Sequence, residues 1–320
     1  MTEYVSEDGT RIILKRNFEE HFRTIFKENF DVFMRYSVSF LRRSIRVNTL
    51  KISVGELKRR LEKKNFTLEP IPWCEEGFWV KHDDGRRDLG NLPEHQLGYF
   101  YVQEAASMIP PIVLNPKPGE LVLDLAASPG SKTTQMAAMM KNKGLIIAND
   151  CKAQRLVMLG LNLQRCGVTN TLVTLMDGRN FKDVLFDKIL LDAPCSATGA
   201  LRKSLKTFKT WNPNSVMSLA RIQIGLIETA FDLLKENGIL VYSTCSVDPE
   251  ENEAVVSHFL EKHKDADLLE IELNIKRSEP FKKFKDKVFD ERISKVLRIH
   301  PQDNDTEGFF VAKIIKRNKQ

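Results

Sequence analysis

The chain has 320 residues, of which 42% are hydrophobic and 29% are charged, and its formal net charge is +6. A chain of this length and composition forms one large globular domain or two of ordinary size. A membrane-spanning protein is excluded, because no apolar run approaches the roughly 20 residues that cross a bilayer. The N-terminus is too acidic for a signal peptide, and we therefore expect a cytoplasmic protein.

The N-terminal third of the chain predicts a small α+β domain. Aromatic and aliphatic residues recur at three- and four-residue steps over 17–41, as in one amphipathic helix or two short ones. Several prolines follow from Pro110 onward, and we place the domain boundary there, giving domains over 1–108 and 109–320. The other elements expected in the first domain are a strand over 44–51, a helix over 54–65, and strands over 66–73 and 77–81.

After Gly119 the pattern changes to alternating strands and helices. This order predicts an α/β fold with a doubly wound, Rossmann-like parallel sheet and right-handed crossovers. The stretch 309–316 is interpreted as a final edge strand, and the highly charged segment 264–298 receives no assignment. The expected strands are 121–125, 145–148, 171–175, 188–191 and 238–242, and the expected helices are 132–140, 152–165, 215–236 and 250–263.

Two of the five cysteines follow directly on expected strands. Cys195 lies in DAPCSATG, beginning at Asp192, and Cys245 lies in YSTCS. Residues just past the carboxyl ends of parallel strands line the active crevice of such a sheet, so two thiols and a carboxylate should meet there. This arrangement favours chemistry that uses a sulfur nucleophile, although a single cysteine after a strand is more often packed in the core. The cysteine spacing fits neither a zinc site nor a disulfide framework, so we expect free thiols and no metal.

A small-residue turn, DLAASPGSKT, follows the first strand of the second domain and opens a helix. Small side chains let backbone N–H groups approach a ligand at a helix N-terminus. Asp150 at the second strand end is placed to accept hydrogen bonds from ribose hydroxyls, and Asp177 after the third could receive an adenine amine. Each acid taken singly is more often a helix cap or turn residue. Together with Asp124 and Asp192, these acids at four successive strand ends favour a nucleoside-containing cofactor.

The positive charge of the chain is unevenly placed. Residues 193–227 contain no acidic residue but five basic ones, directly after Asp192. The segment 276–320 carries 13 Lys/Arg and 7 Asp/Glu. Clustered positive charge beside a site suggests a nucleic-acid substrate, and the alternative is a solvated surface.

The chain resembles the Nop2/Sun family of RNA cytosine-5 methyltransferases, including its archaeal tRNA members. The motifs that carry the resemblance are IRVNTLK (45–51), QEAAS (103–107), DLAASPGSKT (124–133), ANDCKAQRL (148–156), DAPCSATG (192–199), STCSVDPEENEAVV (243–256) and GFFVAK (308–313). The family usually has Cys-Ala-Ala-Pro-Gly at 126–130 and Ser-Gly-Thr-Gly at 196–199, and this chain replaces them with other small residues. The resemblance implies a class I methyltransferase sheet with a smaller N-terminal α+β RNA-binding domain.

The resemblance also implies S-adenosylmethionine as the cofactor and assigns roles to single residues. Cys245 would be the nucleophile, Cys195 would help to break the covalent intermediate, and Lys132 would lie close to the target base. The residues implied for cofactor binding are Ala126, Ala127, Ser128, Pro129, Gly130, Ser131, Lys132, Asp150, Arg155, Asp177 and Asp192.

The chemistry explains why such an enzyme needs a thiol. Carbon 5 of cytosine is a poor nucleophile, and a thiolate added at carbon 6 makes it enamine-like, so that it can accept a methyl group. A thiolate forms more readily near positive charge, for which Lys132 is available. Asp192 can hydrogen-bond the N4 and N3 edge of cytosine, and a paired base would have to be flipped out first.

The substrate is expected to be RNA, with tRNA favoured over ribosomal RNA because the compact chain resembles the archaeal tRNA members. We expect a monomer and no membrane partner. An amino-group methyltransferase is disfavoured, because such enzymes use Asn/Asp-Pro-Pro-Tyr/Phe where this chain has DAPC. A non-catalytic RNA-binding or ribosome-assembly factor is disfavoured because both cysteines are intact. Arg46 and Asn48 have an alternative interpretation of equal weight, in which they lie on a strand edge and their polar side chains point outward without contacting RNA. The residues expected to contact RNA are Arg42, Arg43, Arg46, Asn48, Lys51, Arg202, Lys203, Lys206 and Lys209.

Overall fold

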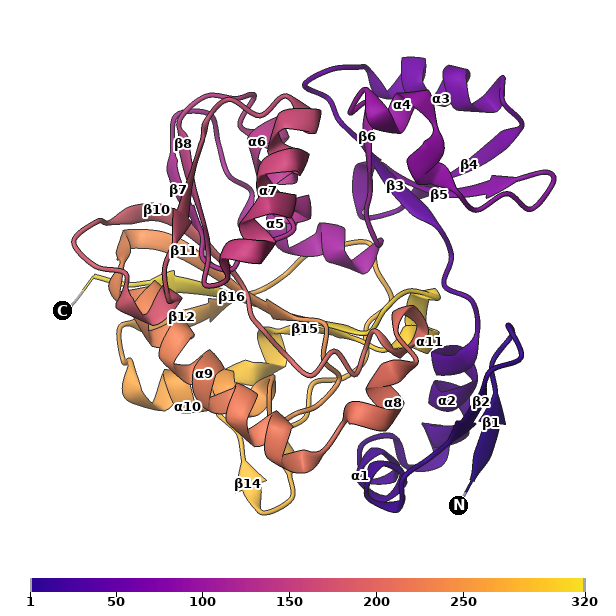
Figure 1. The fold of residues 1–320 in the computed structure, drawn as a ribbon. Helices are drawn as coiled ribbons and strands as arrows, with labels where there is room; N and C mark the ends of the chain where they lie inside the picture. Colours follow the sequence, from indigo (N-terminus) through magenta and orange to yellow (C-terminus); the bar gives the residue numbers. More distant parts are fainter. Residues whose placement is uncertain (1, 319–320) are drawn as a thin grey trace.

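The computed structural model describes residues 2–318 and contains one large and one small mixed α/β region (Figure 1). The large sheet has eight strands in the order β12-β16-β11-β10-β7-β8-β9, with β15 paired to β16. The pairs from β11 to β9 are parallel, whereas β16 is antiparallel to all its neighbours. The strands are β7 (Leu121–Asp124), β8 (Leu145–Asp150), β9 (Thr171–Leu175), β10 (Phe186–Asp192), β11 (Leu234–Thr244), β12 (Ala266–Leu269), β15 (Leu297–Ile299) and β16 (Phe309–Lys316).

Helices cover both faces of this sheet, which is the expected doubly wound fold. Alternate residues of a strand point to opposite faces, and in β10 the side chain of Leu190 packs in one hydrophobic core while those of Ile189 and Leu191 pack in another. The first core contains residues of α5 and α6, and the second contains residues of α9 and α10. The helices are α5 (Ile109–Leu114), α6 (Ser131–Met139), α7 (Ala153–Cys166), α8 (Lys206–Thr210), α9 (Pro213–Asp232), α10 (Glu253–Lys262) and α11 (Pro301–Asn304).

The smaller sheet has four strands in the order β4-β5-β3-β6 and is antiparallel throughout. Its core joins Ile45, Phe78 and Phe100 to Leu57 and Leu61 of the helix that crosses it. That helix begins after Ser53, whose side chain accepts a hydrogen bond from the backbone N–H of Glu56, as a helix N-cap does. The elements are β3 (Ser44–Val47), α3 (Val54–Glu62), β4 (Phe66–Ile71), β5 (Cys74–His82), α4 (Pro93–Gln96) and β6 (Phe100–Val102).

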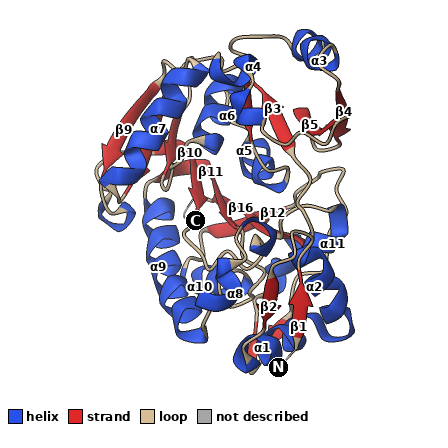
Figure 2. Ribbon diagram, turned by 45° about the vertical axis from the view of Figure 1, so that its right-hand side comes forward, coloured by secondary structure: helices blue, strands red, loops and turns tan. Residues whose placement is uncertain are grey.

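The first segment of the chain packs on the large region rather than on the small sheet (Figure 2). The ring of Phe18 lies 5.3 Å from the rings of both Phe208 and Trp211, and these residues share one hydrophobic core with the large sheet. Of the two alternatives for residues 17–41, one amphipathic helix or two short ones, the structure has the two short helices. The division at residue 108 stays a prediction. The elements of this segment are β1 (Glu3–Val5), β2 (Arg11–Ile13), α1 (Arg16–Phe26) and α2 (Phe30–Val38).

Two expectations at the C-terminal side of the sheet are wrong. The strand over 309–316 is not an edge strand, because β12 and β15 both pair with β16. The helix expected over 215–236 ends at Asp232, since Leu234 already pairs with Phe186 at the start of β11. The segment 264–298 supplies β12, most of β15 and a small hairpin of β13 (Lys283–Phe284) and β14 (Lys287–Val288).

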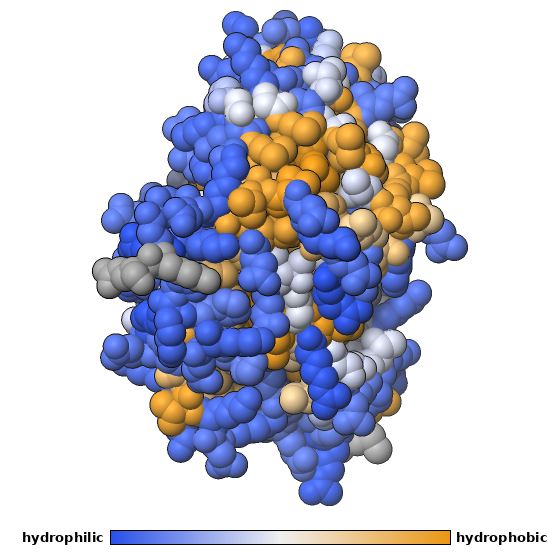
Figure 3. Space-filling view, turned by 90° about the vertical axis from the view of Figure 1, so that its left-hand side faces the viewer, coloured by the Kyte–Doolittle hydropathy of each residue, from blue (hydrophilic) through white to orange (hydrophobic). Residues whose placement is uncertain are grey.

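An apolar surface lies at the opposite edge of the sheet, where β9 and α7 meet the solvent (Figure 3). Its exposed side chains include Val157, Met158, Leu161, Leu172 and Leu175. None of the helices within residues 2–318 has the length and apolar character that crossing a membrane requires.

Candidate active site

The two cysteines expected to meet do so at the carboxyl ends of β10 and β11. These strands pair in parallel with Asp192 beside Ser243, so the residues that follow each strand emerge together. The sulfur atoms of Cys195 and Cys245 lie 3.4 Å apart and both thiols are free. The convergence of two thiols and a carboxylate predicted from the strand ends is therefore confirmed.

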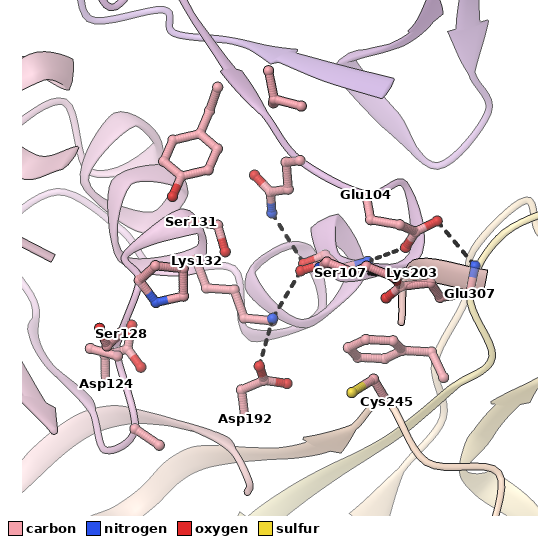
Figure 4. A pocket seen from close by; sticks show the side chains of 17 residues that line it. Glu104, Ser107, Asp124, Ser128, Ser131, Lys132, Asp192, Lys203, Cys245 and Glu307 are labelled. Atoms are coloured by element: carbon pink, nitrogen blue, oxygen red, sulfur yellow. Dashed lines mark hydrogen bonds and ion pairs between the residues drawn. The ribbon is translucent and has the colours of Figure 1, made fainter. Parts of the chain in front are cut away.

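Lys132 and Asp192 form an ion pair beside Cys245 (Figure 4). The Nζ atom of Lys132 donates to Oδ2 of Asp192 at 2.7 Å and to Oγ of Ser107 at 2.9 Å. The hydroxyl of Ser243 donates to the other carboxylate oxygen at 2.8 Å. Burial alone would lower the pKa of Lys132, but the charge and hydrogen bond of Asp192 more than offset this and raise that pKa. Lys132 is therefore a fixed positive charge at the site.

The two thiols differ in their surroundings. The hydrogen bond between the two thiols is the first cause, and burial the second, of a pKa of Cys195 well above its usual value. Cys195 is thus a neutral thiol at physiological pH, able to donate a proton to a neighbouring thiolate. Two cavities adjoin the site; Cys245 lines both of them, whereas Cys195 lines only one.

The first cavity has a volume of about 460 Å³ and lies over the ends of β7, β8 and β10. Carboxylates at its polar wall face apolar side chains of Leu219, Ile222 and Leu226 from α9. One carboxylate oxygen of Asp150 is buried without a hydrogen bond, although it lies 3.2 Å from the guanidinium of Arg155. An unpartnered buried oxygen calls for a donor, and ribose hydroxyls would supply one. This donor set and shape fit a nucleoside-containing cofactor.

The residues expected to bind the cofactor are divided between several positions. Ala126, Ser128, Asp150, Arg155, Asp177 and Asp192 line the first cavity, and Pro129, Ser131 and Lys132 line the second. Ala127 also lines the second cavity, as do Ala126, Ser128 and Asp192, whereas Gly130 lines neither of them.

Neighbouring residues constrain two of these positions, Gly130 and Asp177. Gly130 has a φ of +100° at the start of α6, and a side chain there would lie 2.8 Å from Leu159, so only glycine fits. Asp177 accepts two hydrogen bonds from the Arg179 side chain and one from its backbone N–H, and these lower its pKa to about 2. Asp177 is therefore ionised and already partnered.

The second cavity has a volume of about 300 Å³ and opens on the other side of Lys132 and Asp192. Two acids at its wall were not expected from the sequence. Burial, and then the charge of Glu307, raises the pKa of Glu104 to about 8, and one oxygen of the buried Glu307 has no hydrogen bond among residues 2–318. Both acids belong to or adjoin the motifs QEAAS and GFFVAK, and this was the only signal for them.

A buried polar network holds the two cysteine loops against each other. The carboxylate of Glu251 accepts hydrogen bonds from the backbone N–H and the hydroxyl of Ser196, next to Cys195. The hydroxyl of Ser246, next to Cys245, lies 3.0 Å from that of Thr198 in the other loop. These hydrogen bonds thus fix the positions from which the two thiols project.

For three residues the prediction of RNA contact does not fit the structure, because their side chains are buried and are bonded to other residues of the protein. Arg46 donates to Gln103, to the Ser131 carbonyl and to Thr134, and Asn48 donates to the carbonyls of Gly98 and Cys166. The side chain of Arg202 is 2% exposed and pairs with Asp305 at 2.8 Å. These side chains join the small sheet and the loop after β10 to the large region, and the exposed ones among the expected contacts are Arg43, Lys51, Lys203, Lys206 and Lys209.

Two family models together match most of the chain. The model described as 16S rRNA methyltransferase RsmB/F matches residues 111–315, and the N-terminal domain of 16S rRNA methyltransferase RsmF matches residues 14–105. These matches comprise the large sheet and nearly all of the region that precedes it.

Two relatives show the similarity at the level of whole chains. A tRNA (cytosine(49)-C(5))-methyltransferase of Pyrococcus abyssi is 48% identical, over 94% of this chain and 99% of its own length. Ribosomal RNA small subunit methyltransferase F of Vibrio vulnificus is 44% identical over 96% of this chain, and the chain spans 65% of the length of that relative.

Solved structures agree with these relatives. A methyltransferase homolog of Pyrococcus horikoshii has a TM-score of 0.82 at 38% identity and covers 93% of this chain and 94% of its own. NSun6 of the same organism, solved with the S-adenosylmethionine analogue SFG, has a TM-score of 0.84 at 27% identity and covers 95% of this chain and 99% of its own. The chain belongs to the RsmB/F family of Nop2/Sun-type, S-adenosylmethionine-dependent RNA cytosine-5 methyltransferases.

Proposed function

We propose that this chain methylates carbon 5 of a cytosine in tRNA, with Cys245 as the nucleophile. The observation that carries the proposal is the position of Cys245. Its thiol lies where the two cavities meet, 3.4 Å from a second thiol and on a wall shared with Asp192. One cavity then holds the methyl donor, the other holds the target base, and the nucleophile reaches the base beside the donor.

The first cavity suits S-adenosylmethionine, which supplies a methyl group on a sulfonium when bound. Asp150 would accept hydrogen bonds from its ribose hydroxyls, since one oxygen of this carboxylate is buried without a hydrogen bond. Leu219, Ile222 and Leu226 would pack against the adenine. The turn that begins at Ala126 would bring backbone groups close to the rest of the molecule.

The second cavity suits a cytosine that has left its stack. The Cys245 thiolate would form a bond to carbon 6, and the electron pair of the 5,6 double bond would move towards carbon 5 and N3. Asp192 lies at the wall of this cavity and can accept a hydrogen bond from the N4 amine. Lys132 beside it would stabilise the negative charge that develops on the ring.

Release of the product would need the second thiol. After methylation, carbon 5 would lose its proton to a base, the 5,6 double bond would form again, and the bond from carbon 6 to Cys245 would break. The departing thiolate would be stabilised by the neutral Cys195 thiol, which lies 3.4 Å away and keeps its proton because its pKa is raised.

The choice of tRNA is supported by the 48% identity to the archaeal tRNA relative, matched over 99% of its length. The alternative substrate is ribosomal RNA, on which the bacterial relatives are named as acting. We also propose that the protein is cytoplasmic, that it is a monomer, and that residues 1–108 bind RNA. The last two proposals are supported by the cavities, because residues of one chain line both of them and residues 101–104 and 107 line the one for the base.

Methyl transfer to defined RNAs tests this proposal. The purified protein, given labelled S-adenosylmethionine, should methylate tRNA transcripts, and bisulfite sequencing should place the mark on cytosine. Fragments of small-subunit ribosomal RNA serve as the competing substrate. Cys245→Ala should abolish transfer, whereas Cys74→Ala removes a thiol that lines neither cavity and should keep it. Preferred methylation of the ribosomal fragments would overturn the tRNA assignment.

A further inference from the structure

A groove connects the base cavity to the outer face of the small sheet. A third cavity of about 290 Å³ shares five lining residues with the base cavity, among them Glu104, Lys203 and Glu307. It shares five others with a fourth cavity of about 490 Å³, among them Phe40 and Arg43. The three cavities therefore adjoin one another in a row that begins at Cys245, and this row is the groove.

An exposed aromatic ring lies in this groove. Phe40 is 49% exposed, although burial of a phenylalanine side chain is favourable by roughly 1.5–3 kcal/mol. The guanidinium of Arg87 lies 4.6 Å from the centre of this ring. Phe40 lines both the third and the fourth cavity, so its ring is available to a flat partner that enters from the base cavity.

Positive charge lines the same groove. Arg43 is exposed, and its side chain makes no hydrogen bond or ion pair with any other residue of the described range 2–318. Burial, and then the positive charge of Arg43, lowers the pKa of Arg87, so the two guanidinium groups repel each other in the absence of an anion. The side chain of Lys203, at the junction with the base cavity, is 69% exposed, and its ammonium group lies 3.8 Å from the carboxylate of Glu307.

Acidic groups are also present, and their positions matter. Glu69 in the fourth cavity is paired with Arg42 at 2.6 Å. Glu104 and Glu307 lie at the end of the groove that opens into the base cavity. Glu7 lies beside the middle of the groove, where its carboxylate accepts a hydrogen bond from the backbone N–H of Phe40 at 2.7 Å, but it lines none of the three cavities. With the guanidinium groups of Arg43 and Arg87 against this one carboxylate, the middle of the groove keeps a positive surplus.

We propose that this groove binds the unpaired RNA nucleotides next to the target cytosine, with phosphates at Arg43, Arg87 and Lys203 and an unstacked base on Phe40. The inference rests on the proposed entry of the target base beside Cys245. An aromatic ring with flanking cations is the arrangement by which proteins hold single strands, because every base has a face that can stack. A duplex does not offer unstacked bases, so the groove selects RNA that is locally single-stranded at the target.

Equilibrium binding of short RNAs to the full chain tests the proposal. The probes are a fluorescent single-stranded RNA with one central cytosine and a hairpin in which the same cytosine is paired. Phe40→Ala should weaken binding of the single strand roughly 5- to 150-fold. Phe40→Tyr should keep most of the affinity, and Leu97→Ala, which removes an exposed apolar side chain outside the groove, should leave it unchanged.

Salt dependence tests the phosphate contacts. Arg43→Ala should reduce the slope of log affinity against log salt by about 0.7, the value for one contact to a single strand. Arg59→Ala removes an exposed arginine that lines none of these cavities and should not change the slope. Unchanged binding of the single strand by both Phe40→Ala and Arg43→Ala, with thermal unfolding like that of the wild type, would overturn the proposal.

The outcome can be separated from that of the proposed function. If methylation of RNA requires Cys245 but the groove variants bind as the wild type does, the groove assignment fails alone. If the groove variants lose binding as expected but Cys245→Ala still methylates RNA, the groove assignment stands and the nucleophile is wrong.

Discussion

The buried ion pair between Arg298 and Glu253 should be the interaction whose loss destabilises this protein most clearly. The Nη1 atom of Arg298 lies 2.9 Å from both carboxylate oxygens of Glu253, and the two side chains are 1% and 0% exposed. A second guanidinium nitrogen donates to the backbone carbonyl of Val247, which follows Cys245 by two residues. This contact joins β15 to the loop that carries the proposed nucleophile.

The size of the effect follows from what each substitution leaves behind. Arg298→Met leaves the Glu253 carboxylate buried without its partner, which costs about 3–5 kcal/mol. Arg298→Met combined with Glu253→Leu removes both charges, and the backbone N–H of Phe281 then loses its acceptor, a cost of about 1–3 kcal/mol. The Val247 carbonyl loses its donor in both variants and does not affect the comparison. The double variant should therefore be more stable than the single variant Arg298→Met.

Urea denaturation measures these differences, and pH supplies a second test. Burial raises the pKa of Glu253 above its value in the unfolded chain, and the charge of Arg298 lowers it, so removing Arg298 raises the folded pKa further. A raised carboxyl pKa means that the folded state binds more protons, and stability falls as pH rises. The loss caused by Arg298→Met should be smaller at pH 5 than at pH 8. Glu253→Leu alone is the second single variant. If the losses of Arg298→Met and Glu253→Leu simply add in the double variant, the reasoning is refuted.

Three further predictions concern the site itself. Cys195→Ala, incubated with RNA and S-adenosylmethionine, should accumulate a covalent RNA complex on a denaturing gel that disappears when Cys245 is also replaced; normal turnover without a complex would make Cys195 a structural thiol. Asp150→Asn should weaken cofactor binding by calorimetry roughly tenfold or more, because a hydrogen bond to a charged group contributes about 1.5–3 kcal/mol, and unchanged affinity would exclude the ribose contact. Charge reversal at Lys206 and Lys209 should flatten the salt dependence of RNA binding, and an unchanged slope would show that these lysines are only a solvated surface.

The parallel half of the sheet could be predicted because its local signals agree with each other. Each strand there is a short run that leads into an acid or a cysteine-containing turn, and all except 171–175 are followed by a helical pattern before the next strand. The strand over 171–175 has the predicted bounds, as does 309–316. The meeting of Cys195 and Cys245 followed from the same rule, since carboxyl ends of parallel strands share one edge.

The antiparallel side could not be predicted because its strands are defined by their partners. β12 and β15 have four and three residues, too few for a periodic pattern, and they form by pairing with β16. Lys235 and Glu236 are good helix formers, yet they lie in β11, because pairing of Leu234 with Phe186 overrides their propensity.

The sequence also did not predict which polar side chains are buried. Arg46 and Asn48 resemble solvent-facing residues of a strand, but the strand is covered on both faces and every residue of β3 is buried. Their partners are Thr134 and a carbonyl of Cys166, distant in the sequence. Which polar side chains become buried depends on how the two regions of the chain pack, and a single sequence does not display that.

Identification of the residue bonded to the base tests the central claim most directly. The wild-type protein is incubated with S-adenosylmethionine and an RNA that carries 5-fluorocytosine at the target, so that carbon 5 has no proton to lose and the adduct persists. Mass spectrometry of the digested complex should find the methylated base attached to a peptide that contains Cys245. Attachment to Cys195, or turnover of ordinary RNA with no adduct on the fluorinated one, would contradict the assignment of Cys245 as the nucleophile.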